Sequence, residues 1–74
     1  MMDDQAPMLT PMVLARYYVS RMARHVEDEH FQELCRTIAY AIHPAHTAYQ
    51  IALQLGVPDL PTPEEVLRKG VLPD

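Results

Sequence analysis

The feature that most constrains the fold is a run from Met12 to His43 that contains neither glycine nor proline. All seven prolines of the chain lie outside this run. Proline removes a hydrogen bond from a helix interior and glycine lowers helix propensity, so a long segment that avoids both is typical of helix. The run therefore predicts a helical body with irregular segments on either side.

The chain has 74 residues, enough for one domain at most. From the ends of the proline-free run and the turn residues beyond it, we expect a flexible N-terminal tail over residues 1–9 and a C-terminal tail over residues 71–74. A single helical domain should occupy residues 10–70. The fold class that we predict is all-α, a small domain of three to four helices in which a helical hairpin precedes two short C-terminal helices.

Two apolar stripes follow one another within the run. The first has the spacing of one buried helix face over residues 11–26 and comprises Ala15, Tyr18, Val19, Met22 and Val26. The second comprises Phe31, Leu34, Cys35, Ile38 and Ile42. A helix turns by about 100° per residue, so the second stripe is rotated by more than a quarter turn from the first. We therefore expect a break between Glu27 and His30 with Asp28 as the capping residue; the alternative is one long helix, as in an intermolecular bundle.

The C-terminal third contains clear signals for helix starts and stops. His43-Pro44 should end the second helix and begin a third, because the residue before a proline avoids the α region and proline suits the first helical position. Gly56 should end that third helix. Thr62–Glu65 has the pattern of a capping box, in which the Thr62 hydroxyl and the Glu65 side chain satisfy each other's backbone N–H groups. We expect a short fourth helix over residues 63–69.

Charge and composition narrow the class of protein. The net charge of −4 argues against binding to nucleic acid by charge alone. The N-terminus is acidic where a secretory signal is basic, and the longest mostly apolar stretch is too short to span a membrane. The single cysteine, Cys35, excludes a disulfide within the chain. We expect a soluble cytoplasmic protein that binds neither membrane nor, in its main role, nucleic acid.

The residues that favour enzyme or metal chemistry are few. Cys35 lies on an apolar stripe, where a thiol acts as a small hydrophobic group, and Ser20 has no evident catalytic base. His25, Glu29 and His30 have helical spacings that suit metal ligands, but the chain supplies no matching set from another helix. We therefore expect no catalytic activity, no cofactor and no metal site, unless an oligomer completes one.

Residues 47–57 resemble the first helix and turn of a helix-turn-helix motif. The resemblance rests on Ile51, Ala52, Leu55, Gly56 and Val57, and with the following helix it covers residues 47–69. In that family the second helix reads DNA from its N-terminal end, so the resemblance implies a DNA-binding regulator. The chain departs from the motif because Pro58–Pro63 makes the turn too long and Glu64 and Glu65 would face phosphates with negative charge. DNA binding is therefore our alternative function.

The function that we expect is a small non-enzymatic protein-interaction module, of the phage or accessory type, that regulates or inhibits a partner protein by occluding it. Tyr and Arg are the residue types that dominate protein interfaces, and the first helix carries arginines as its only charged residues. The expected contact residues are Val13, Tyr17, Arg21 and Arg24.

We also expect a homodimer. The first two helices offer more apolar surface than the short third and fourth helices should be able to cover, and small domains often gain stability by self-association. The residues expected at the dimer interface are Leu14, Tyr18, Met22 and Val26.

Overall fold

The computed structural model describes residues 9–73, and that part of the chain contains helices and no β-strand. The elements in chain order are α1 (Pro11–Met22), the 3₁₀ helix η1 (Ala23–His25), α2 (Asp28–Ala39), α3 (Pro44–Gln54) and α4 (Pro63–Lys69). The predicted all-α class is confirmed. None of these helices is long and apolar enough to cross a bilayer.

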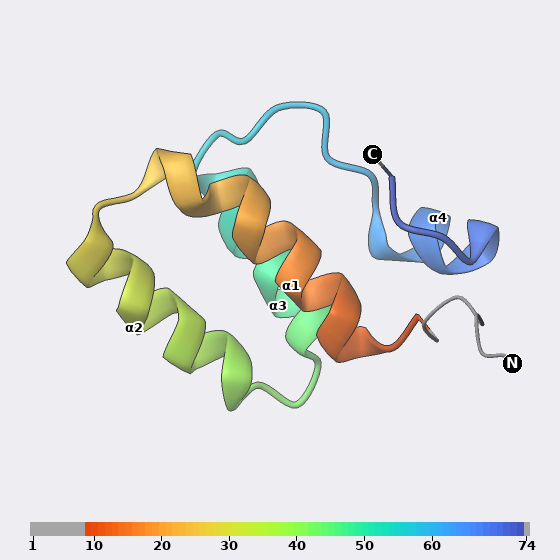
Figure 1. The fold of residues 1–74 in the computed structure, drawn as a ribbon, viewed down its shortest axis with the longest axis horizontal. Helices are drawn as coiled ribbons and strands as arrows, with labels where there is room; N and C mark the ends of the chain where they lie inside the picture. Colours follow the sequence, from red (N-terminus) through yellow and green to blue (C-terminus); the bar gives the residue numbers. More distant parts are fainter. Residues whose placement is uncertain (1–8, 74) are drawn as a thin grey trace, which may run out of the picture.

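The helices are arranged around a central pair, α1 and α3, which pack side by side (Figure 1). This is the most extensive contact in the molecule, although residues 23–43 separate the two helices in the chain. The helix α2 flanks this pair, and α4 lies near the start of α1, at the end of a long connection (Figure 1). Residues 1–8 of the expected N-terminal tail lie outside the described residues, whereas Leu9 packs against the core.

The start of the first helix is set by a capping residue, and the helical segment ends where the backbone becomes extended. The Thr10 hydroxyl accepts a hydrogen bond from the Val13 N–H at 3.2 Å, which caps the N-terminus of α1. After η1 the backbone becomes extended at Val26 and Glu27. The predicted break between the two stripes is therefore confirmed, and the alternative of one continuous helix is wrong. The N-cap of α2 is Glu27, one residue before the predicted Asp28, and it forms no side-chain capping bond.

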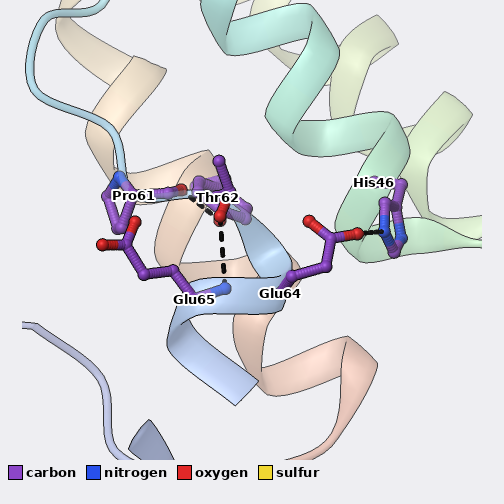
Figure 2. A network of polar contacts seen from close by, with 6 residues as sticks. His46, Pro61, Thr62, Glu64 and Glu65 are labelled. Carbon is purple, nitrogen blue, oxygen red and sulfur yellow. Dashed lines mark hydrogen bonds and ion pairs between the residues drawn. The ribbon is translucent and has the colours of Figure 1, made fainter. Parts of the chain in front are cut away.

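The last two helices start and stop at the predicted residues. Gly56, which follows the Leu55 C-cap of α3, has φ 84°, a left-handed conformation that is easiest for glycine. The Thr62 hydroxyl accepts a hydrogen bond from the Glu65 N–H at 3.2 Å (Figure 2). The reciprocal bond from the Glu65 carboxylate is not formed in the part of the chain described here. Gly70, with φ 77°, ends α4.

The core is built where α1 meets α3. Leu14, Tyr18 and Met22 of α1 are completely buried, as are Ala48 and Ala52 of α3. The two alanines allow the helix backbones to approach closely, so that the large α1 side chains fill the space between the helices. Pro63 and Val66 of α4 and Val57 in the preceding loop are also buried. The apolar stripes did not predict these three residues.

The close packing of α1 on α3 corrects the expected dimer interface. From the sequence we expect Leu14, Tyr18, Met22 and Val26 at a contact with a second copy, because the first two helices offer more apolar surface than the last two should cover. Leu14, Tyr18 and Met22 are each 0 % exposed within a single chain, and only Val26 keeps partial exposure. These three side chains are core residues, so their assignment to a dimer interface is wrong.

The apolar face of α2 is less completely covered. Ile38 is buried, but Phe31, Leu34 and Cys35 are only partly so. Ile42, expected to extend this stripe, is 89 % exposed. The reason is that α2 ends at Ala39, so Ile42 lies in the connection to α3 and does not share the helix face.

Candidate functional site

The residues expected to contact a partner lie along α1 and η1. Tyr17 and Arg21 are one helical turn apart, and a guanidinium nitrogen of Arg21, Nη1, donates a hydrogen bond to the Tyr17 hydroxyl at 2.8 Å. Arg24 follows in η1 and is exposed. Val13 lies one turn before Tyr17 and is partly buried. The structure thus places Tyr17 and Arg21 in the second half of α1 and Arg24 just beyond its end, whereas Val13 lies near the N-terminus of that helix.

A shallow surface depression lies at this end of α1, which we call the arginine depression. Its lining comes from the last turn of α1, from η1 and from the loop after α3, and consists of Ser20, Arg21, Arg24, His25, Val57 and Pro58. Only Arg21 and Arg24 among these were predicted as site residues. The loop residues could not be found from the sequence, because no local pattern links them to a helix more than thirty residues earlier.

Arg21 is held in place by two neutral oxygen atoms. Besides the Tyr17 hydroxyl, its Nη2 atom donates to the backbone carbonyl of Pro58 at 2.7 Å. Neither acceptor carries a charge, and within residues 9–73 no carboxylate pairs with Arg21. A guanidinium has five N–H donors, so three remain for a ligand while the positive charge stays unneutralised.

The other polar side chains of the depression differ in what they can offer an anion. The Ser20 hydroxyl donates to the Tyr17 backbone carbonyl at 2.7 Å, so its proton is already used. Arg24 and His25 are exposed, and neither forms a side-chain hydrogen bond or ion pair in the described part of the chain. The side chains of the depression that carry a positive charge are therefore the two guanidinium groups of Arg21 and Arg24.

One of the two arginines, Arg21, also has a structural role. Arg21 lies in the last turn of α1, where a positive charge is favoured by the helix dipole, and its bond to Pro58 ties α1 to the loop after α3. This structural role accounts for Arg21. Arg24 has no such role, because its side chain forms no hydrogen bond to another segment of the described chain.

Several acidic residues lie close in sequence to those that line the arginine depression. Glu27, Asp28 and Glu29 begin two residues after η1, and Asp59 follows Pro58 in the loop. All four are exposed, and none of them lines the depression. The positive region is small, on a chain whose net charge is −4.

The metal ligands considered from the sequence do not come together. Across residues 9–73 no three His, Cys, Asp or Glu side chains are placed to hold one ion. His30 instead lies with its Nδ1 atom 3.5 Å from a carboxylate oxygen of Glu33 on the same helix. His25 lines the arginine depression, whereas Glu29 does not.

A second polar cluster lies between α3 and α4, where it has a structural role. The His46 Nε2 atom is 2.9 Å from the Glu64 carboxylate, across the two helices (Figure 2). This hydrogen bond, together with one from the backbone N–H of Glu64 itself, lowers the pKa of the Glu64 carboxyl below its ordinary value. Glu64 and Glu65 begin α4, and residues 55–62 separate that helix from α3, so the two departures from the helix-turn-helix motif are present in the structure.

Comparison of the chain with protein-family models, with curated protein sequences and with solved structures finds no match. A function must therefore be inferred from the geometry of the arginine depression and its surroundings.

Proposed function

We propose that this protein is a small non-enzymatic interaction module that regulates or inhibits a partner protein by covering part of its surface. The observation that carries the proposal is the state of Arg21, whose guanidinium is fixed by the Tyr17 hydroxyl and the Pro58 carbonyl without a carboxylate to neutralise it. A positioned, unneutralised cation is a feature that a binding partner can use, and it stands beside a second exposed arginine, Arg24, that has no structural role in the fold.

A binding role is supported further by the chemistry of the depression. A hydrolase or transferase of the nucleophilic type needs a nucleophile activated by a neighbouring base. The only hydroxyl lining the depression, that of Ser20, donates its proton to a backbone carbonyl. The thiol of Cys35 lies on α2, outside the depression.

The partner that we propose is a different protein. A second copy docked on the apolar face of α1 has little support, because that face is enclosed by α3. Binding to DNA through residues 47–69 also has less support, because Glu64 and Glu65 stand at the start of α4. A cytoplasmic location fits a chain with one cysteine, although it is not required by it.

The test of this proposal uses Arg24, because Tyr17 and Arg21 also support the fold. Tyr17 packs edge-on against the buried Tyr18, with ring centroids 5.3 Å apart, and Arg21 binds the Pro58 carbonyl. Arg24 is exposed and has no such contact. The immobilised protein should capture a partner from native lysate, and Arg24→Ala should weaken that capture.

The matched control is Arg16→Ala. Arg16 is an exposed arginine of α1, but it does not line the depression. It removes the same charge from the chain and should leave capture unchanged. Equal capture by the wild-type protein and both variants would refute the proposed surface.

A further inference from the structure

We infer that the arginine depression binds the side-chain carboxylates of a short acidic peptide segment. The inference rests on the proposed function and names the chemistry by which the partner would be recognised. Arg21 and Arg24 would each donate to carboxylate oxygens, while Val57 and Pro58 form the apolar wall against which the segment lies.

The first support for this inference is the preorganisation of Arg21. An arginine side chain has many rotamers, and fixing one of them on binding is costly in entropy. Here Tyr17 and Pro58 already hold the guanidinium, at 2.8 and 2.7 Å, before any ligand is present. Its remaining N–H donors can bind a carboxylate with a smaller entropic cost than those of a free surface arginine.

The second support is the spacing of the two arginines. Arg21 is in the last turn of α1 and Arg24 is three residues later in η1. Residues three apart share one face in an α-helix, and they align even more closely in a 3₁₀ turn. Both side chains line the same depression, so two adjacent carboxylates, or both oxygens of one, can be reached together.

The third support concerns the size of the positive region, which favours a short acidic peptide over a nucleic acid. A nucleic-acid strand carries charge along its whole length, and a protein that binds it must offer a continuous basic track. The depression offers two arginines, which can bind a few acidic side chains, on a chain whose net charge is −4. That net negative charge disfavours a long polyanion.

The experiment is an NMR titration of ¹⁵N-labelled full-length protein with a hexaglutamate peptide at low ionic strength. Amide signals of residues 20–25 and of Val57 should shift together. Arg24→Ala should weaken the affinity by about fivefold, the upper range for one exposed ion pair. Arg16→Ala should change it by less than about twofold, since Arg16 lies outside the depression.

Three results would overturn the inference: no saturable shift with hexaglutamate, equal loss of affinity in Arg16→Ala and Arg24→Ala, or tighter binding of a short DNA duplex to the same residues. The capture experiment separates this inference from the proposed function. If Arg24→Ala abolishes capture of a partner but hexaglutamate does not bind, the interaction surface stands and carboxylate recognition fails. If hexaglutamate binds but capture is insensitive to Arg24, the anion site stands and the proposed function fails.

Discussion

The hydroxyl of Tyr18 donates a hydrogen bond to the backbone carbonyl of Pro61 over 2.7 Å. Tyr18 is completely buried in the middle of α1, and Pro61 lies just before α4, so this bond joins two segments that are distant in the chain. Burial, with the nearby rings of Tyr49 and Tyr17, raises the pKa of the Tyr18 hydroxyl, which keeps it a neutral donor. This contact ties the segment that precedes α4 to the centre of α1.

Substitution of Tyr18 by Phe should therefore reduce the stability of the domain. It removes the donor and leaves the Pro61 carbonyl without this partner, which we expect to lower the free energy of unfolding by about 1–2 kcal/mol. Urea denaturation followed by circular dichroism measures the change. The control is Tyr40→Phe, because Tyr40 is 85 % exposed and its hydroxyl should contribute almost nothing. Equal stability of Tyr18→Phe and the wild-type protein would show that the bond is not formed in solution.

The space between α1 and α3 should not accept a larger side chain. Ala48 is completely buried where α3 packs against α1, and Ala48→Leu would force the helices apart or push side chains out of their preferred rotamers. We expect a loss of about 1–3 kcal/mol in the free energy of unfolding, which chemical denaturation can measure. Leucine at Ala39, the exposed last residue of α2, is the control and should be tolerated. Unchanged stability of Ala48→Leu would contradict the close α1–α3 contact.

Acid should weaken the link between α3 and α4. The hydrogen bond with His46 lowers the pKa of Glu64 in the folded protein, so the unfolded chain takes up this proton at a higher pH than the folded one. The contribution of Glu64 to stability is therefore present above its unfolded pKa of about 4.3 and is lost as the pH falls through the lower folded value. Both groups are exposed, so the effect should be small.

The melting temperatures of the wild-type protein and of Glu64→Gln, compared between about pH 3 and pH 7, isolate this contribution. The difference in favour of the wild-type protein at neutral pH should shrink toward acid, while the other carboxylates titrate alike in both proteins. A difference that stays constant over this range would mean that His46 and Glu64 are not coupled in the folded state.

Much of the secondary structure could be predicted because its signals are local. Thr10 and Thr62 cap helices whose first residue is a proline, and Gly56 and Gly70 adopt the left-handed conformation that follows a helix end. Each of these signals acts within one helical turn. The helix ends could be predicted because a cap involves only neighbouring residues.

The packing of the helices could not be predicted in the same way. How fully α3 covers α1 depends on the close approach of two helices through Ala48 and Ala52, which a count of apolar residues does not describe. The bond from Arg21 to Pro58 joins two parts of the lining of the arginine depression. It has no sequence signal, because the two residues are far apart in the chain. The arginines were predicted as a surface, whereas the loop that holds one of them in place appears only in three dimensions.

The most direct test of the central claim is site-specific photo-crosslinking of the full chain in its native lysate. A photoreactive residue replacing Ser20 lies in the arginine depression but removes neither guanidinium group, whereas one replacing the exposed Gln32 lies on α2, outside the depression. A crosslinked partner should form from position 20, should be absent from position 32 and should be lost when Arg24→Ala is added. Crosslinking of the same protein from both positions, or from position 20 irrespective of Arg24, would contradict the assignment of the arginine depression as the recognition surface.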